Sequence, residues 1–252
     1  MHNVAGHRPY SLLAEAYDDI VGRKFFLLVR DAFEHIVARH RIGFASVADL
    51  GCGTGLFARY LNRLWRVPVF GVDISPAMLR VAASNCRGTK VTLLRQDLLR
   101  LALPRPVDLI TANFDTVNHL VGDGDLPRLF RRVFRHLHPG GHFIFDFITP
   151  CNPPDEMTVH FRRSADGRKD VAQRIRWVPA RRLFLYDIMF RDPASPRGRM
   201  ELHRERAYSP QEVASWLMEA GFMLRDVLDA ATLRRATVCP SRVIVVAQKV
   251  LH

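Results

Sequence analysis

The sequence predicts an α/β fold in which a doubly wound parallel sheet carries a small antiparallel insertion. Two patterns in its 252 residues predict this. From residue 43 to 150, short apolar runs alternate with amphipathic stretches of helical period, as in parallel strands covered by helices on both faces. From residue 151 to 207, the apolar residues alternate in period two without helical stretches between the runs, which is typical of antiparallel strands.

The elements before residue 150 follow in order along the chain. Residues 11–40 have apolar side chains at helical spacing and are expected to form a helix. Strands are expected at Val47–Leu50, Val67–Val72, Val91–Leu94, Val107–Ala112 and His142–Phe147. Helices are expected at Leu56–Leu64, after the start signal Ser75-Pro76, and at Leu126–Leu137, which Pro139-Gly140-Gly141 should end.

After residue 150 the expected strands lie near Val159–Phe161, Arg174–Val178, Leu183–Phe190 and Met200–Arg206. Ser209 and Glu212 have the spacing of a capping box, which starts a helix that ends near Gly221. Strands near Phe222–Leu228 and Arg242–Gln248 bring the main sheet to seven. The expected organisation is a helical lid at residues 1–42, a main domain at 43–150 and 208–252, and an antiparallel β insertion at 151–207.

Composition and cysteine spacing exclude several classes of protein. Hydrophobic residues make up 48% and charged residues 25%, which is typical of a folded globular chain. The apolar runs are far shorter than the roughly 20 residues of a membrane helix, and the N-terminus has no signal-peptide core. The cysteines have neither close pairing nor metal-ligand spacing, so a disulfide framework or a zinc site is not expected. We expect a soluble cytoplasmic protein with no membrane partner.

The net charge of +12 is the unusual feature of the composition. A basic balance raises the question of a nucleic-acid partner. Nearly all the basic residues are arginines scattered from Arg8 to Arg242, without the clustering that a nucleic-acid footprint requires. A solvated basic surface is therefore favoured, and a nucleic-acid partner stays open as the alternative.

A glycine-rich loop follows the first expected strand and reads Asp49-Leu-Gly51-Cys-Gly53-Thr-Gly55. Glycines let the chain turn tightly and let a ligand approach the backbone. Dinucleotide sites have a third glycine one place later, where this chain has Leu56, and Asp49 suits a cationic ligand group better than a pyrophosphate. At the end of the next strand, Asp73 can accept both hydroxyls of an adenosine ribose.

Four blocks of sequence resemble the class I S-adenosylmethionine-dependent methyltransferases. The blocks are Asp49-Leu-Gly-Cys-Gly-Thr-Gly55, Gly71-Val-Asp73-Ile-Ser-Pro-Ala-Met78-Leu, Gln96-Asp97-Leu98 and Leu137-His-Pro-Gly-Gly-His142. They span about residues 45–150 in the order that the family has. The resemblance implies a seven-stranded Rossmann-like methyltransferase fold, and an enzyme that uses S-adenosylmethionine and releases S-adenosylhomocysteine.

The resemblance also implies how the cofactor is held. Asp49 would face its ammonium group, Asp73 its ribose hydroxyls, and Asp97 the amino group of its adenine. The full set of expected cofactor contacts is Tyr17, Asp49, Gly51, Gly53, Asp73, Ile74, Met78, Asp97, Leu98 and Asn113.

The segment Asn113-Phe-Asp-Thr-Val-Asn-His-Leu120 follows the fourth strand and should border the transferred methyl group. It is similar to a segment of small-molecule N-methyltransferases that act on sugar amines, glycine and toxoflavin precursors. The similarity makes Asn118 and His119 candidate catalytic residues and Phe114 a candidate substrate contact. The alternative is that Phe114 packs in the core and Asn118 caps a helix.

The N-terminal helix resembles one that covers the site in similar enzymes. It makes Tyr10 a candidate catalytic residue and Tyr17 a candidate cofactor contact, with helix packing as the alternative for both. In the insertion, the aromatic residues Trp177 and Tyr186 are candidate substrate contacts, because aromatic walls suit a small, flat ligand. The alternative is that these aromatic residues form the core of the insertion itself.

Methyl transfer from a sulfonium needs mainly the alignment of donor and acceptor. A hydroxyl acceptor would need a general base, and the possible bases Asp115, His119, His142 and Asp146 have no partner visible in the sequence. This favours a nitrogen acceptor on a small molecule of secondary metabolism, with a toxoflavin-like heterocycle, and thus toxin biosynthesis, as the specific hypothesis.

Three alternatives stay open: an RNA methyltransferase, a small-molecule O-methyltransferase, and a non-catalytic scaffold that binds the cofactor. Amino-directed DNA methyltransferases resemble one another in an Asn-Pro-Pro-aromatic tetrad after the fourth strand. In this chain Asn152-Pro153-Pro154 is followed by Asp155 and comes after the fifth strand, so the tetrad is not matched. The intact glycine loop and Asp73 count against a scaffold. A monomer or a homodimer is expected.

Overall fold

The computed structural model describes residues 9–151, 153, 158–163, 170–192, 195–236 and 239–250. Its main sheet has seven strands in the order β10-β11-β5-β4-β1-β2-β3. The strands are β1 (Val47–Leu50), β2 (Val69–Asp73), β3 (Val91–Arg95), β4 (Val107–Ala112), β5 (Leu137–Ile148), β10 (Phe222–Asp229) and β11 (Arg242–Lys249). The first five are parallel, and β11 lies antiparallel between β5 and β10. This confirms the predicted fold class.

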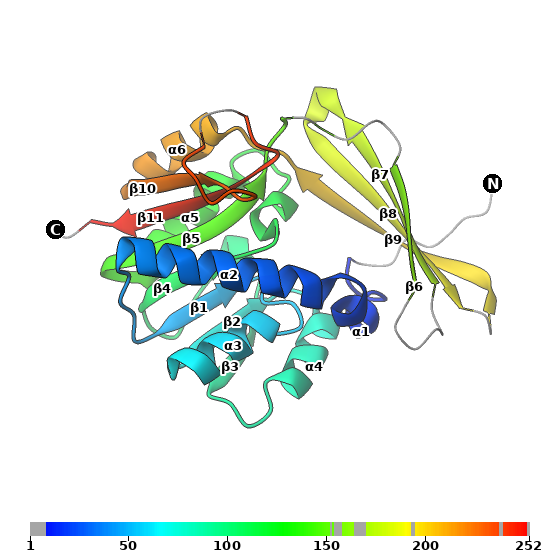
Figure 1. Cartoon of the computed structure of the whole chain (residues 1–252), viewed down its shortest axis with the longest axis horizontal. Helices are drawn as coiled ribbons and strands as arrows, with labels where there is room; N and C mark the ends of the chain where they lie inside the picture. Colours follow the sequence, from blue (N-terminus) through cyan, green and yellow to red (C-terminus); the bar gives the residue numbers. More distant parts are fainter. Residues whose placement is uncertain are drawn as a thin grey trace.

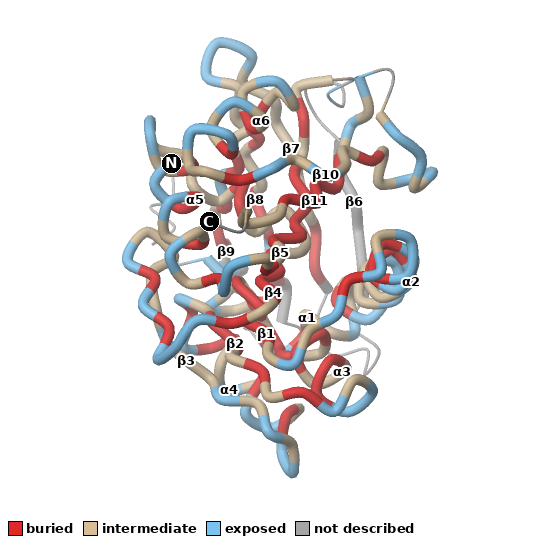
Figure 2. Tube along the Cα trace, turned by 90° about the vertical axis from the view of Figure 1, so that its left-hand side faces the viewer, coloured by how far each residue is buried: buried red, intermediate tan, exposed pale blue. Residues whose placement is uncertain are grey.

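Helices cover both faces of this sheet, because successive strand residues point to opposite sides. On one face, α2 (Arg23–His40) and α3 (Leu56–Trp65) pack on Val47 and Ile144. On the other, α5 (Asp125–His136) and α6 (Pro210–Glu219) pack on Ala48 and Phe145. Figure 1 shows α2 crossing one face of the sheet, and Figure 2 shows the buried strands enclosed between the helical layers.

The helix expected at residues 11–40 is divided into three parts. Helix α1 (Ala14–Tyr17) leads through a π-helical turn, Asp18–Gly22, into α2. The Asp18 carboxylate accepts hydrogen bonds from Thr54 Oγ1 in the glycine loop, at 2.6 Å, and from Asn85 Nδ2 at the end of α4 (Pro76–Asn85), at 3.0 Å. Helix α1 also packs against α4. These contacts fix the N-terminal segment over the carboxyl edge of the sheet.

A second, four-stranded antiparallel sheet comes between β5 and α6. Its strands are β6 (Thr158–Arg163), β7 (Asp170–Val178), β8 (Leu183–Asp192) and β9 (Ser195–Arg206), paired in chain order. Figure 1 shows it projecting beyond the carboxyl ends of β1 and β4, beside the start of the N-terminal helix. Strand β9 therefore borders the same edge of the main sheet as the glycine loop.

Two local expectations are wrong. The segment Pro139-Gly140-Gly141 does not separate helix and strand, because β5 already begins at Leu137 and runs through it. Two of the four cysteines are paired: Cys151 and Cys239 form a disulfide, with their Cα atoms 5.6 Å apart. Their separation of 88 residues hid the pairing, since the fold alone brings the end of β5 beside the start of β11.

Candidate active site

A cavity of about 1130 Å³ lies at the carboxyl edge of the main sheet. It exceeds the roughly 300–1,000 Å³ of a typical pocket for one small ligand, so it has room for a cofactor and an acceptor together. All ten residues expected to contact the cofactor line it: Tyr17, Asp49, Gly51, Gly53, Asp73, Ile74, Met78, Asp97, Leu98 and Asn113. Tyr10, Phe114 and His119 line the cavity too.

The glycine loop forms the floor of the cavity. Gly51 and Gly53 have φ angles of 65° and 53°, in the left-handed region that glycine adopts without strain. A Cβ atom at Gly51 would lie 2.3 Å from Oγ1 of Thr116, so any larger residue would force the Thr116 side chain to move. At Gly53 the same atom would meet only Gly51 O at 4.0 Å, so it would project into open space that a ligand can fill.

The Asp73 carboxylate is fixed at the end of β2 by the backbone. It accepts hydrogen bonds from Gly53 N at 2.9 Å and from Ser75 N at 2.8 Å, one on each oxygen. Burial raises the pKa of Asp73 and these two bonds oppose the shift. A carboxylate held in this way lines the cavity and can accept further hydrogen bonds, as the hydroxyls of a ribose require.

The Asp49 carboxylate is almost fully buried beneath the loop. It accepts a hydrogen bond from Thr111 Oγ1 at 2.8 Å. Burial raises its pKa to about 7, and the Thr111 bond opposes the shift. A cationic ligand group would hold the carboxylate ionised. The side-chain amide of Asn113, which also lines the cavity, acts on the same carboxylate and likewise lowers its pKa.

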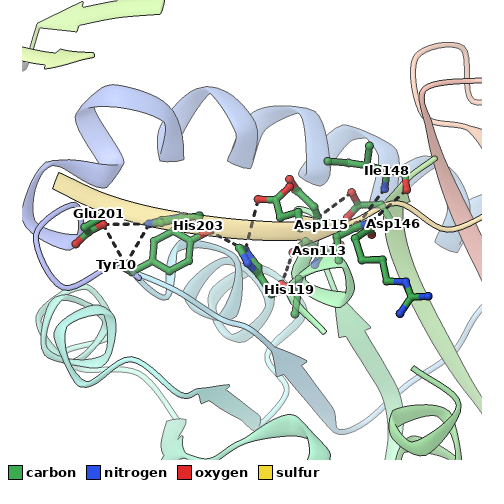
Figure 3. A network of polar contacts seen from close by, with 12 residues as sticks. Tyr10, Asn113, Asp115, His119, Asp146, Ile148, Glu201 and His203 are labelled. Carbon is green, nitrogen blue, oxygen red and sulfur yellow. Dashed lines mark hydrogen bonds and ion pairs between the residues drawn. The ribbon is translucent and has the colours of Figure 1, made fainter. Parts of the chain in front are cut away.

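Tyr10 and His119 meet on the wall of the cavity. The Tyr10 hydroxyl lies 2.9 Å from Nε2 of His119 (Figure 3). Burial lowers the pKa of His119 to about 4, so the imidazole is neutral at physiological pH and can accept the hydroxyl proton. Burial also raises the pKa of Tyr10 well above its usual value, so the hydroxyl stays protonated. The pair therefore offers polar atoms but no charge to an acceptor.

The backbone around this contact is strained. Tyr10 has a φ angle of 60°, and the neighbouring residues Phe114 and Asp115 have φ angles of 58° and 49°. Residues other than glycine rarely adopt this backbone conformation. Strained residues of this kind occur more often at functional sites than elsewhere. The centre of the Phe114 ring lies 4.7 Å from the centre of the Phe25 ring in α2. This packing closes the wall of the cavity at Phe114.

Glu201 of β9 holds the strained segment in place. Its fully buried carboxylate accepts hydrogen bonds from the backbone N–H groups of Tyr10, Leu12 and Leu13, and from the hydroxyl of Ser11 at 3.1 Å. His203 Nε2 lies 3.1 Å from its second oxygen. Figure 3 shows Glu201 and His203 beside Tyr10. The inserted sheet therefore fixes the position of Tyr10 from behind.

Three candidate residues lie outside the lining of this cavity. The Asn118 amide is fully buried, donates to the backbone oxygens of Ile148 and Arg206, and accepts from the N–H of Ile148. Its place is structural, because it joins the loop after β4 to β5 and β9. The Trp177 ring packs on Phe184 at 4.5 Å, and Tyr186 lines a separate cavity of about 170 Å³. The aromatic packing of the insertion accounts for both.

Glu201 and Glu205 were not among the residues expected at the site. They alternate with His203 along β9, so period two places all three side chains on one face, and all three are buried. The period-two spacing of three ionisable side chains was the only signal in the sequence, and it does not show which face of the strand is buried. Among the residues that the structure describes, no group of three or more metal-ligating side chains is arranged to hold a metal ion. Likewise, no helix in the described ranges is long and apolar enough to span a membrane.

Comparison with known proteins agrees with this geometry. The methyltransferase-domain family matches residues 47–141. A putative methyltransferase of Geobacillus sp. strain WCH70 is 25% identical over 95% of this chain and 99% of its own. The dTDP-3-amino-3,6-dideoxy-alpha-D-glucopyranose N,N-dimethyltransferase of Streptomyces fradiae is 30% identical over 58% of this chain and 56% of its own. The crystal structure of an S-adenosylmethionine-dependent methyltransferase from Clostridium acetobutylicum ATCC 824 is 25% identical, covers 96% of this chain and 99% of its own, and has a TM-score of 0.79.

The fold is an α/β fold with a cavity at the carboxyl edge of its sheet, and the glycine loop, Asp49 and Asp73 in that cavity fit a cationic nucleoside ligand. With its methyltransferase domain at residues 47–141, the chain is an S-adenosylmethionine-dependent methyltransferase, and S-adenosylmethionine is its cofactor.

Proposed function

We propose that this enzyme transfers the methyl group to a nitrogen atom of a small molecule. The observation that carries the proposal is the Tyr10–His119 contact, which brings a hydroxyl oxygen and a neutral imidazole together on the wall of the cavity. The relative from Streptomyces fradiae, which is named as an N,N-dimethyltransferase, supports it. A cavity enclosed by the N-terminal segment and β9 suits a small acceptor better than a polymer.

When bound, the cofactor supplies an activated methyl group on a sulfonium centre. The chain supplies binding and alignment. Asp73 and the open space at Gly53 hold the nucleoside part, and Asp49 faces the ammonium end. Because the Tyr10 hydroxyl donates to Nε2 of His119, its oxygen lone pairs are free to accept an N–H of the acceptor. That bond aims the nitrogen lone pair at the methyl group.

Two kinds of nitrogen acceptor fit this description. One is a nitrogen-rich heterocycle of the toxoflavin type, for which the apolar Phe114 and Leu120 on the wall are suitable contacts. The other is an aliphatic amine, such as the amino group of the sugar for which the Streptomyces relative is named. In both, the nitrogen attacks in line with the breaking bond between carbon and sulfur.

The test uses S-adenosylmethionine labelled with deuterium in the methyl group. The protein is incubated with this cofactor and an extract of its source organism, and the label is traced by mass spectrometry. We expect the label in the small-molecule fraction, on nitrogen. Label in RNA, DNA or protein, or on an oxygen atom of a small molecule, would contradict the proposal.

A further inference from the structure

We infer that the acceptor is an aliphatic amine, which is a cation in solution, and that a buried acidic cluster behind Tyr10 and His119 selects it. The acidic cluster consists of Asp115, Asp146 and Glu205 with the guanidinium of Arg242. The inference rests on the proposed function, because it specifies which kind of nitrogen the site methylates.

The cluster lies directly behind His119. Nε2 of His119 is 3.7 Å from Oε1 of Glu205. Nη1 of Arg242 is 2.9 Å from Oδ1 of Asp115 and also contacts Oδ2 of Asp146. The same oxygen of Asp146 accepts the backbone N–H of Asp115 at 3.2 Å. Figure 3 shows Asp115 close to His119, and Asp146 farther away, near Ile148.

The charges of the cluster do not balance. Three carboxyl groups face one guanidinium, which stays charged at any relevant pH. Burial and the nearby Asp115 raise the pKa of Glu205 well above its usual value, so Glu205 holds a proton. For Asp115, burial is outweighed by Arg242, which lowers the pKa. Burial and the nearby Asp115 raise the pKa of Asp146, while Arg242 and the backbone N–H of Asp115 oppose that shift. Because Asp146 contacts Nη1 of Arg242 directly, we take it as ionised together with Asp115, which leaves the cluster with one negative charge in excess.

The other charged groups near this end do not neutralise that charge. Glu201 is occupied by its hydrogen bonds to residues 10–13 and by His203. Arg206 pairs with Asp123 at 2.6 Å. Arg204 lines the same cavity, but its side chain is exposed to solvent, which screens its charge. His119 itself is neutral, so the excess negative charge acts across it on the acceptor.

The sign of this charge distinguishes the acceptor classes. An ammonium acceptor first loses one proton to water, through Tyr10 or directly. The nitrogen lone pair then forms the bond to the methyl carbon, while the electrons of the carbon–sulfur bond go to sulfur. Positive charge leaves sulfur and develops on nitrogen, beside the acidic cluster, which stabilises it.

A hydroxyl or a ring N–H behaves in the opposite way. Each must lose a proton to become a strong nucleophile, and it then develops negative charge. The same cluster repels that charge. The cluster therefore favours an amine in two ways. It attracts the ammonium form into the cavity, and it stabilises the positive charge that develops on nitrogen during transfer. This counts against the toxoflavin-like heterocycle.

The first test compares three pooled libraries of acceptors with the wild-type enzyme: small aliphatic amines and nucleotide-linked amino sugars, their hydroxyl analogues, and bicyclic heterocycles with a ring N–H. Incorporation of deuterated methyl is measured at equal concentrations. We expect the amine pool to be labelled at least about tenfold faster than the other two. Faster labelling of the heterocycles would overturn this inference and leave the proposed function standing. Faster labelling of the hydroxyl analogues would overturn both.

The second test removes the excess charge in two ways. Asp115→Asn and Asp146→Asn each take one negative charge from the cluster, and thermal unfolding checks that each variant folds. For the amine labelled fastest, we expect kcat to fall about tenfold to a hundredfold in both, with the Kd for S-adenosylmethionine unchanged. Asp31→Asn, on the exposed face of α2, is the matched control. If whichever of the two variants folds keeps the wild-type kcat, the cluster has no such role.

Discussion

The hydroxyl of Tyr10 and Nε2 of His119 lie 2.9 Å apart, although the two residues are separated by 109 positions in the chain. The contact joins the N-terminal segment to the loop after β4. Behind it, Glu201 of β9 holds the backbone of Tyr10. Three separate parts of the chain therefore build the acceptor end of the cavity, while most of the residues expected to hold the cofactor come from the loops after β1, β2 and β3.

Removing the Tyr10 hydroxyl should slow transfer without loss of cofactor binding. In Tyr10→Phe the acceptor loses one neutral hydrogen bond, worth about 0.5–1.5 kcal/mol, so we expect kcat to fall about twofold to tenfold. Steady-state kinetics and calorimetric titration of S-adenosylmethionine measure the two effects. Unchanged kcat would reduce Tyr10 to a packing residue.

Glu201 should act through Tyr10 as a positioning residue. In Glu201→Gln the carboxylate that binds residues 10–13 loses its charge, so we expect kcat to fall by about tenfold, with the exposed Glu219→Gln as the control. The double variant with Tyr10→Phe should be little slower than the slower single variant, because coupled residues are not additive. Effects that simply multiply would show that Glu201 has only a structural role.

Asp73 should hold the ribose of the cofactor. Asp73→Ala removes a carboxylate that accepts two hydroxyls, and bonds to a charged group are worth about 1.5–3 kcal/mol each, so the Kd for S-adenosylmethionine should rise at least about tenfold. Asp73→Asn retains an oxygen for Gly53 N or Ser75 N and separates binding from folding. Wild-type affinity in a titration calorimeter would refute the assignment.

Cofactor affinity should weaken in acid because of Asp49. Burial raises the pKa of this carboxyl to about 7, so below that pH the free enzyme holds a proton that must leave before a cationic ligand binds. The Kd should therefore rise by up to tenfold per unit as the pH falls from about 7 to about 6. Asp49→Asn should bind more weakly and lose this slope. If the Kd for S-adenosylmethionine depends on pH in the same way for the wild-type enzyme and for Asp49→Asn, the pH dependence does not come from Asp49.

The cofactor half of the site could be predicted because its signals are local. Gly51, Gly53 and Asp73 stand at fixed distances from strands that hydrophobic patterning already locates. The acceptor half depends on packing between distant segments. For Asn118 the sequence cannot show that its amide is taken up by the backbone of β5 and β9, and for Trp177 it cannot show which side of the insertion faces the cavity.

The acidic residues of β9 illustrate the same limit. Glu201, His203 and Glu205 share one face by period two, yet only the fold reveals that this face meets Tyr10 and His119 and not solvent. The Cys151–Cys239 disulfide was hidden for the same reason. In each case the residue types were visible in the sequence, whereas their neighbours were set by the topology of two sheets.

The atom that receives the methyl group tests the central claim most directly. The product formed with 13C-methyl-labelled S-adenosylmethionine and the fastest acceptor can be isolated, and carbon–nitrogen and carbon–oxygen attachment distinguished by two-dimensional NMR. We predict a methyl group on an amine nitrogen. A methyl group on oxygen would contradict the function proposed for this site and the role given to its acidic cluster.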